Sequence, residues 1–384
     1  MIKLHKGCSQ DGEPCQISKM YEHYVSNVRY NSVTSRFRDD PGKMLVSAIM
    51  VLKSPTEHER GVIITNYNHY FSVIQKLFDI HGISKKYYVV LEASYSGYCS
   101  EDVLCYTLIR EPVFVLAPEP RDAIFLNKLN SNLIPVPLGA NWWVDYRVFK
   151  PIDTGKKEYD IIMVGSWAPL KRHASLFSAL KKLRSKNIKL KTCLIGYPMG
   201  YTLEDIRSIA KDFGVDDQIE YHEWVTPEEV NYHLNRSKVN VLWSRFEGSN
   251  RAIIEGMFAG VPCILRRGIT YGHKYDYINA KTGCYADDSD LHHVMLSMVE
   301  SFDHFRPREW VLENMTCHKA VDILGQTIGE KALGAGEDWN GGLAAKVNSL
   351  HGMQYWDVSH YDKFSADYEY LRSKIRAPIT YNFA

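Results

Sequence analysis

The sequence predicts an α/β protein of two domains, each built on a parallel sheet with crossover helices. The chain has 384 residues, more than the roughly 250–300 at which a single hydrophobic core usually stops growing. Short apolar runs rich in β-branched residues alternate with helical patterns, which is typical of parallel sheets. Residues 149–160, "FKPIDTGKKEYD", combine Pro, Gly and charge and separate one series of such runs from the next.

The apolar runs are the predicted strands. They span residues 61–67, 87–93, 113–118 and 132–139 in the first series, and 159–166, 190–197, 239–244 and 262–266 in the second. The second series is the clearer one, because Gly165 is followed by a loop and then by a helix with one apolar stripe, formed by Leu176, Phe177, Leu180 and Leu183. We therefore expect the second domain to be doubly wound.

A second helix of this domain has a recognisable start. In "TPEEVNYHL", Thr226 is the expected N-cap, Pro227 takes the first helical position and Glu229 completes a capping box. We place the hinge within residues 150–157 and the two domains at 1–152 and 153–328. Residues 329–384 are expected to form a Gly-rich segment and then a helix that crosses back toward the first domain, with a packing stripe of Phe364, Tyr368, Leu371 and Ile375.

The charge balance narrows the classes of partner that the chain could bind. Lys plus Arg (46) nearly equals Asp plus Glu (45), which argues against a nucleic acid held by overall charge but leaves a local basic patch open. Residues 181–191, "KKLRSKNIKLK", are such a run, and we expect them to complement a helix C-terminus. The alternative is contact with nucleic acid or with anionic lipid.

Cysteine usage and hydropathy indicate a cytoplasmic protein. The eight cysteines are scattered singly, without the close paired spacing of a zinc site, and we interpret them as reduced thiols. The N-terminus has no apolar signal segment, and no run approaches the ~20 apolar residues of a membrane span. At most peripheral contact with the inner face of a membrane is expected.

Two carboxylates flank a turn in "EGSNRAIIEGMFAGVPCIL", residues 247–265. The preceding strand ends at Ser244, and we expect Ser249 or Asn250 to cap a helix that stops at Gly260. Doubly wound sheets bind ligands at the carboxyl ends of their strands, and free amides at a helix start suit a phosphate.

A carboxylate can accept two hydrogen bonds and so hold a vicinal diol. On this reasoning Glu255 would hold the ribose of a nucleotide and Glu247 would lie nearer a transferred sugar. The alternative is that both acids only cap the helix or pair with Arg245 and Arg251.

These residues carry a resemblance to a known family. "EGSNRAIIE" resembles the E-x7-E motif of retaining GT-B glycosyltransferases of family four, also called glycosyl transferases group 1. "YDIIMVGSWAPLKRHASLFSAL", "CLIGYPMG" and "NAKTGCYADDSD" resemble other parts of their donor domain. The resemblance covers about residues 130–325 well and the rest only by position. It implies two Rossmann-like domains facing across a cleft, a nucleotide diphosphate sugar as co-substrate, and neither a metal nor another cofactor.

The resemblance also implies roles for individual residues. Lys171 would bind the donor diphosphate, Glu255 the ribose, and Glu247, with the Gly248, Ser249 and Asn250 backbone, the sugar and the distal phosphate. The remaining donor-site residues would be Gly165, Ser166, Gly196, Trp224 and Val225. Taken alone, Lys171 would be a weak signal, because a lysine in a loop before a helix is usually solvated, and its spacing from Gly165 is what supports the assignment.

The sequence departs from the family pattern at several positions. Ser166 stands where the family has an arginine, and we expect Arg251 to supply the missing charge to the distal phosphate. The usual glycine-rich loop is absent from the first 14 residues, and the acceptor-domain histidine has no clear counterpart. His69 and Glu92 each follow an apolar strand and are the candidates, although His69 could be a helix-start histidine without a catalytic role.

One acidic stretch needs a separate interpretation. "DSD", residues 288–290, could be mistaken for a metal-binding motif, but it precedes a helix, and we expect it to act as an N-cap.

The expected function is a retaining hexosyltransferase. It would use a UDP- or GDP-sugar and a saccharide, a glycolipid or another hydroxyl acceptor. The alternatives are a non-catalytic partner subunit that keeps the donor pocket, and an epimerase or phosphorylase of nucleotide sugars. The sequence leaves the donor, the acceptor and the oligomeric state open.

Overall fold

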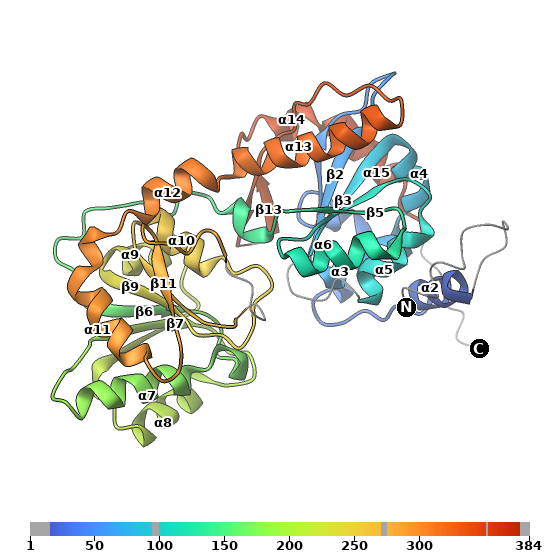
Figure 1. The fold of residues 1–384 in the computed structure, drawn as a ribbon. Coiled ribbons are helices and arrows are strands. Elements are labelled where there is room, and N and C mark those ends of the chain that lie inside the picture. The colour runs from blue at the N-terminus through green and yellow to red at the C-terminus, as the bar shows by residue number, and fades with distance from the viewer. Residues whose placement is uncertain (1–15, 94–99, 270–274, 351, 377–384) are drawn as a thin grey trace, which may run out of the picture. The chain divides into compact units, whose positions relative to one another are not determined.

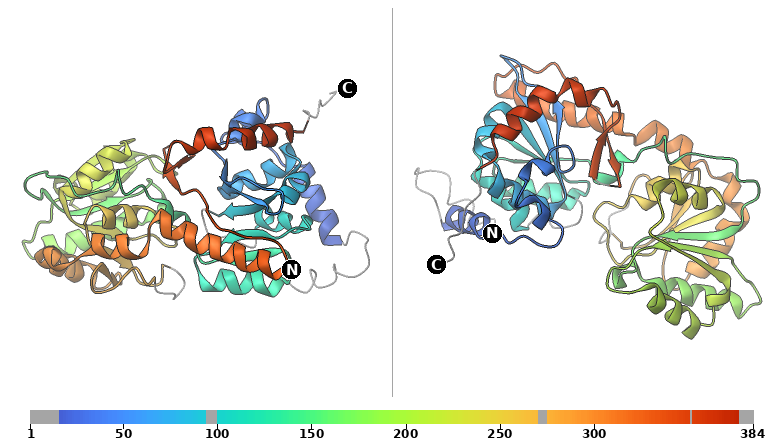
Figure 2. Two further views of the ribbon diagram at one scale, coloured as in Figure 1. Left: turned by 90° about the horizontal axis from the view of Figure 1, so that it is seen from above. Right: turned by 180° about the vertical axis from the view of Figure 1, so that it is seen from behind.

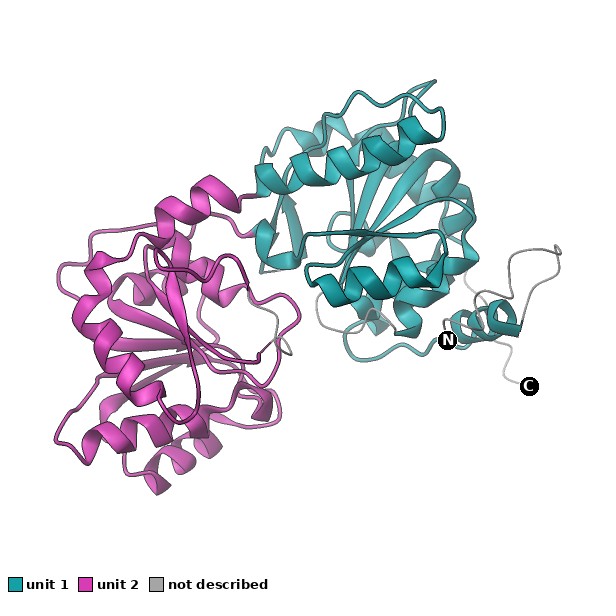
Figure 3. Cartoon of the chain, in the orientation of Figure 1, with its two compact units in different colours: residues 1–143, 317–384 teal, residues 144–316 magenta. Residues whose placement is uncertain are grey.

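The structure is a computed structural model that describes residues 16–93, 100–269, 275–350 and 352–376. Contacts divide the chain into two compact units (Figure 3). The first unit consists of residues 1–143 and 317–384, and the second of residues 144–316. The predicted divisions, after residues 152 and 328, fall later. The second of them lies inside a continuous helix, Cys317–Gly334, which ends at Gly334 and is followed by Gly336 with φ +77°.

The first unit contains a five-stranded sheet in the order β1-β2-β3-β4-β5 (Figure 1). Neighbouring strands from β2 to β5 run parallel, as predicted, but β1 pairs antiparallel with β2 and was not expected. The strands are β1 (Ile49–Lys53), β2 (Gly61–Asn66), β3 (Tyr87–Glu92), β4 (Val113–Leu116) and β5 (Leu133–Val136). The register pairs Asn66 with Glu92 at the carboxyl edge of this sheet.

Helices and a hairpin complete the first unit. They are α2 (Gln16–Ser26), α3 (Asn68–Leu77), α4 (Ile80–Lys86), α5 (Glu101–Leu104), α6 (Pro120–Leu129), α13 (Cys317–Gly334), β12 (Lys346–Ser349) with β13 (Gly352–Tyr355), α14 (His360–Lys363) and α15 (Ser365–Ser373). The predicted C-terminal helix packs on this unit: Phe364, Tyr368 and Leu371 are buried, and the Tyr368 hydroxyl accepts a 3.3 Å hydrogen bond from the β1 backbone at Val51. Figure 2 shows α15, in red, beside the blue strands.

The second unit is a doubly wound sheet, as predicted. Its six strands are all parallel, in the order β11-β10-β9-β6-β7-β8. They are β6 (Tyr159–Val164), β7 (Thr192–Gly196), β8 (Ile219–Glu223), β9 (Ser237–Leu242), β10 (Cys263–Arg266) and β11 (Gly283–Ala286). The chain builds β6 to β8 outward in one direction and then places β9 on the other side of β6, so the topological switch point lies between β6 and β9.

Helices cover both faces of this sheet. One face carries α7 (His173–Arg184), α8 (Leu203–Asp212) and α11 (Leu291–Ser301), whose apolar residues share one core with alternate strand residues. The other carries α9 (Pro227–Asn235), α10 (Ala252–Phe258) and α12 (Pro307–Asn314). The predicted stripe of α7 is buried, and the capping box of α9 forms as predicted. Among the described helices, none is both long and apolar enough to cross a bilayer.

Candidate active site

Two loops meet at the switch point of the second unit. The first follows β6 and contains Gly165 and the short 3₁₀ helix Pro169–Lys171. The second follows β9 and leads into α10. The Arg245 backbone N–H donates to the Leu170 carbonyl over 2.8 Å, which fixes one loop against the other. Crevices at this position in open α/β sheets are where ligands bind.

A lysine–glutamate ion pair links these loops. Lys171 Nζ lies 2.5 Å from Glu247 Oε1, and the Ser244 hydroxyl donates to the same oxygen over 2.5 Å. The lysine and glutamate side chains are only 17% and 11% exposed. A Cβ on Gly165 would lie 3.4 Å from the Lys171 stem, so the glycine lets that stem pass closely. Glu247 therefore pairs with Lys171, and the alternative of a solvated Lys171 is wrong.

The start of α10 differs from the prediction. Its N-cap is Arg251, so the assignment of the cap to Ser249 or Asn250 is wrong. Asn250 is buried, and its amide donates to the Tyr277 hydroxyl over 3.2 Å, which turns that side chain toward another loop. The end of α10 is as predicted. Gly260 has φ +84°, and the Val261 N–H returns to the Gly256 carbonyl in a Schellman motif.

Glu255 lies one turn into α10 and is half-buried. Burial raises the pKa of its carboxyl, and the charge of Arg251, four residues earlier, opposes that shift. A carboxylate that has lost water gains most from new hydrogen-bond donors, because an unsatisfied buried oxygen is costly. A ligand diol could supply two such donors. The geometry is compatible with the predicted ribose contact, which stays a prediction.

Gly196 has a strict packing role at the end of β7. A Cβ there would lie 2.5 Å from the Gly165 carbonyl oxygen and 2.8 Å from two ring carbons of Trp167. Trp167 is fully buried, and its indole N–H donates to Glu223 over 2.5 Å. Gly196 therefore keeps the first loop in place. Ser166, which lies within that loop, is buried.

Trp224 is the most exposed aromatic of the predicted site. It follows β8 with φ +56° and is 72% exposed. Its ring lies 5.4 Å from that of Tyr197 at 33°, so the two rings offer an exposed aromatic surface at the carboxyl ends of β7 and β8. Val225 comes next and is half-buried. Gly248 and Ser249 are half-buried in the loop after β9.

Two arginines near this edge were missed. Arg172 ion-pairs with Asp288 over 2.8 Å, and the Arg266 guanidinium donates to the Ser244 carbonyl over 2.9 Å. Burial, and then the charge of Arg172, lowers the pKa of Arg266, so the two arginines are close enough to interact electrostatically. Arg172 directly follows Lys171, a signal that could have identified it as a substitute for the arginine missing at Ser166.

The expectation for the "DSD" stretch was only partly right. Asp290 is the N-cap residue of α11, but within the described chain its carboxylate accepts from the Asp287 backbone rather than capping the helix. Asp288 accepts from the Trp243 indole over 2.8 Å in addition to pairing with Arg172. Its role is to hold the first loop.

His69 and Glu92 belong to the first unit, whereas Lys171, Glu247 and Glu255 belong to the second. Glu92 ends β3 and forms a buried ion pair with Lys346, 2.6 Å between Oε2 and Nζ, with side chains 2% and 0% exposed. His69 lies in the first turn of α3, its ring 4.2 Å from that of Tyr70. Burial lowers the pKa of His69, partly offset by Asp102, so its imidazole is neutral at pH 7. The N-terminal stretch without the glycine-rich loop lies outside the described residues.

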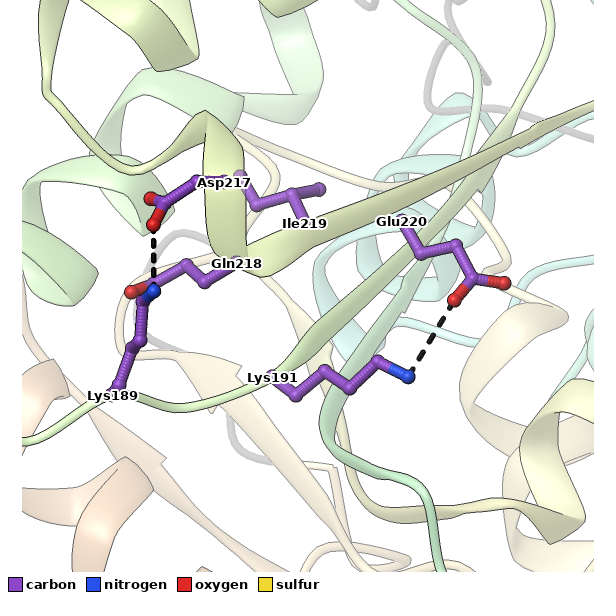
Figure 4. Close-up of a pocket in the computed structure, with 6 residues that line it drawn as sticks. All are labelled: Lys189, Lys191, Asp217, Gln218, Ile219 and Glu220. Carbon is purple, nitrogen blue, oxygen red and sulfur yellow. Dashed lines mark hydrogen bonds and ion pairs between the residues drawn. The ribbon is translucent and has the colours of Figure 1, made fainter.

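A surface pocket lies at the opposite, amino ends of β7 and β8 (Figure 4). It is lined by Lys189, Lys191, Asp217, Gln218, Ile219 and Glu220. Lys189 and Arg184 pair with Asp217, and Lys191 with Glu220. Three of the six basic residues of the run 181–191 therefore pair with two acids, and this pocket is separate from the switch point.

Comparison with known proteins identifies the second unit. Residues 147–296 match the family described as Glycosyl transferases group 1. This part of the chain is a glycosyl transferases group 1 domain. No curated protein matches the sequence of the chain.

Solved glycosyltransferase structures share the fold. Sucrose-phosphate synthase from Thermosynechococcus elongatus is 16% identical, with a TM-score of 0.53 over 72% of this chain and 74% of that one. HepE from Anabaena, in complex with UDP-glucose, is 11% identical, with 0.52 over 70% and 78%. TarM is 17% identical, with 0.52 over 68% of this chain but only 54% of its own. These likenesses show that the chain has the GT-B fold of two Rossmann-like domains, and its group 1 domain makes it a glycosyltransferase.

Proposed function

We propose that this glycosyltransferase moves a hexose from a UDP- or GDP-sugar to a saccharide, a glycolipid or another hydroxyl acceptor, with retention at the anomeric carbon. The observation that carries the proposal is the Lys171–Glu247 pair at the switch point. The cation could bind the diphosphate of a sugar donor, and the carboxylate could accept hydrogen bonds from its sugar hydroxyls.

Donor binding would exchange partners within this pair. The diphosphate is a stronger acceptor cluster than one carboxylate, so it would draw Lys171 away from Glu247 through charge-assisted hydrogen bonds. The freed carboxylate of Glu247 could then accept hydrogen bonds from the sugar hydroxyls. Arg251 and Arg172 would add positive charge near the distal phosphate, where the family pattern lacks its arginine at Ser166.

The nucleoside would be held by the remaining predicted residues. Glu255 would accept both ribose hydroxyls, and the exposed rings of Trp224 and Tyr197 would offer a face for the base. We favour uridine as the base, since HepE, which has the same fold, was solved with UDP-glucose.

Transfer would need no metal at this site. As the bond from the anomeric carbon to the phosphate oxygen breaks, negative charge grows on the leaving diphosphate, and preorganised cations stabilise it. The acceptor oxygen bonds to the anomeric carbon on the same face, and its proton passes to the leaving phosphate oxygen. His69, neutral at pH 7, is the candidate side chain on the acceptor side, while Glu92 is occupied by Lys346.

Turnover assays distinguish this function from its alternatives. The full chain is incubated with UDP-glucose, UDP-GlcNAc or GDP-mannose in excess EDTA. Slow release of free sugar and nucleotide diphosphate supports a transferase. An altered sugar would indicate an epimerase, sugar 1-phosphate formed only with added phosphate a phosphorylase, and binding without turnover a partner subunit. Activity that vanishes in EDTA and returns with Mg²⁺ would overturn the metal-free chemistry.

Glu255→Gln tests the ribose contact. The variant should bind UDP at least tenfold more weakly, about 1.4 kcal/mol, because an amide has one acceptor oxygen where the carboxylate has two. Its thermal stability should be no lower than that of wild type, because the neutral amide avoids the cost of a buried charge. Calorimetric titration gives the affinity. Glu204→Gln, at an exposed position on α8 of the same unit, is the control. Equal UDP affinity in Glu255→Gln and wild type would remove Glu255 from the site.

A further inference from the structure

Three potential metal ligands come together in the second unit, away from the donor site. They are Cys193 on β7, His222 on β8 and His233 on α9, and their ligand atoms all lie within 4.8 Å of one another. The register pairs Cys193 with Glu220 and Ile195 with His222. Side chains two residues apart on a strand share a face, so Cys193 and His222 point to the same side of the sheet.

The cluster contains a buried nitrogen without a partner. His233 is 7% exposed, and within the described residues its Nδ1 has no hydrogen-bond partner. The two imidazole rings lie 4.0 Å apart, and the Cys193 side chain is fully buried. Buried polar atoms are nearly always satisfied, so this nitrogen requires an explanation.

A carboxylate orients the second histidine. Glu220 Oε1 lies 3.0 Å from His222 Nε2 and accepts a 2.6 Å hydrogen bond from the Tyr159 hydroxyl. The hydrogen-bond network therefore assigns the proton to Nε2 and leaves the lone pair on Nδ1 of His222. A carboxylate behind a ligating histidine is the usual outer partner of a protein-bound metal ion.

We propose that Cys193, His222 and His233 form a zinc-binding site, with the fourth position open to water. One thiolate and two imidazoles suit Zn²⁺, whereas Mg²⁺ and Ca²⁺ prefer oxygen ligands. Binding breaks the S–H bond of Cys193, forms a Zn–S bond and releases the proton to solvent. Glu220 also lines the surface pocket of Figure 4, which places the cluster next to a route from solvent.

The site would act on structure rather than on transfer. Cys193 is the second residue of β7, near its amino end, whereas Gly196, at the carboxyl end, abuts the first loop. His222 and His233 flank the loop that carries Trp224 and Val225, so zinc would tie both ends of that loop to β7. This inference is independent of the proposed function.

Zinc binding to the full chain is the first test. Chelator-treated, dialysed protein receives ZnCl₂, and bound metal is measured by atomic emission after desalting, together with the melting temperature. We expect one zinc per wild-type chain and a higher melting temperature, both lost in Cys193→Ser and His233→Asn. The controls are Cys263→Ser, a fully buried thiol on β10 of the same sheet, and His292→Asn, a buried histidine on α11. Glu220→Gln should weaken zinc binding roughly 10–100-fold.

Cobalt reports directly on the thiolate. Co²⁺ added to the wild-type chain should give the thiolate-to-cobalt charge-transfer absorption of a tetrahedral site, retained in Cys263→Ser and absent in Cys193→Ser. Wild-type protein that takes up no zinc or shows no such band would overturn the proposal, even if Cys193→Ser does not fold. So would a band that persists in Cys193→Ser, since another cysteine would then be the ligand.

Discussion

The ion pair between Lys171 and Glu247 sets the charge of the donor site before any donor arrives. Each side chain is mostly shielded from water, and a partly buried charge that loses its partner is costly. The two residues should therefore act as a unit, so that their substitutions are not additive.

A double-mutant cycle tests this coupling. Lys171→Met should weaken UDP binding at least tenfold, about 1.4 kcal/mol, because it removes a cation and leaves Glu247 to repel the diphosphate. Adding Glu247→Gln should restore part of that affinity. Lys238→Met is the control, since Lys238 forms a comparable pair with Asp160 over 2.7 Å, with side chains 28% and 20% exposed. A double variant that binds UDP no better than Lys171→Met would contradict the coupling.

His173 gives the second unit a pH-dependent stability. The side chain is 3% exposed, and its Nε2 has no hydrogen-bond partner within the described chain. Burial, and then the charge of Lys171, lowers the pKa of His173 to about 4. At pH values between about 6.5 and 4, His173 is protonated in the unfolded chain but neutral in the folded chain. The stability is therefore fully present above about pH 6.5 and is lost as the pH falls toward 4.

Urea unfolding at several pH values measures this effect. Between pH 7 and pH 4, wild type should lose about 3 kcal/mol of unfolding free energy that His173→Gln does not lose. His304→Gln, whose side chain is 81% exposed in wild type, should behave like wild type. Equal pH slopes in wild type and His173→Gln would show that His173 does not titrate in this way.

At the scale of elements, the end of β7 positions the first loop. Gly196→Ala would force its new methyl group against the Gly165 carbonyl and the Trp167 ring, and overpacking of this kind costs typically about 1–3 kcal/mol. We expect a lower melting temperature and weaker UDP binding, because Gly165 and Lys171 would shift together. Gly334→Ala at the end of α13 is the control, since nothing lies within 4 Å of the position that its new methyl group would take. A variant at Gly196 as stable as that control would contradict the packing argument.

Local signals in the sequence predicted many elements correctly. The capping box at Thr226 and the stripe of α7 depend on neighbours along the chain, so the sequence contains all that determines them. Strand β8 was missed because its residues, "IEYHE", are all half-buried at a sheet edge and form no apolar run. Strand β1 was missed because it pairs antiparallel with β2. No crossover helix joins the two strands, so β1 falls outside the alternation of strands and helices from which strands were predicted.

The site was predictable to the extent that it follows from one motif. Glu247 and Lys171 were assigned separately, but their direct pairing, and the bonds of Arg172 and Arg266, depend on how two distant loops meet. The partner of Glu92, Lys346, is far away in sequence, as are the three members of the Cys193 cluster. Such contacts depend on how distant parts of the chain come together in the fold, and the spacing of residues along the sequence does not show this.

At the scale of the whole molecule, the second unit is one continuous stretch of chain with its own core. A fragment of residues 144–316 should fold cooperatively and bind UDP within about tenfold of the full chain, about 1.4 kcal/mol, without transferring sugar. Circular dichroism melts and calorimetric titration are the measurements. Residues 1–143 alone should not fold cooperatively, because they lack α13, α15 and Lys346. An unfolded 144–316 fragment would contradict the division into units.

The first unit is built from two separate segments of the chain, so it cannot be complete until both segments have been translated. Translation completes residues 144–316 while residues 317–384 are still unmade. At about 5–20 residues per second, that last segment takes roughly 3–14 s to appear. During this interval Glu92 has no counter-ion, and a carboxylate that is buried in the finished protein must stay in contact with water. We therefore expect residues 144–316 to fold before the first unit is complete, and the buried pair of Glu92 to form only after Lys346 has been translated.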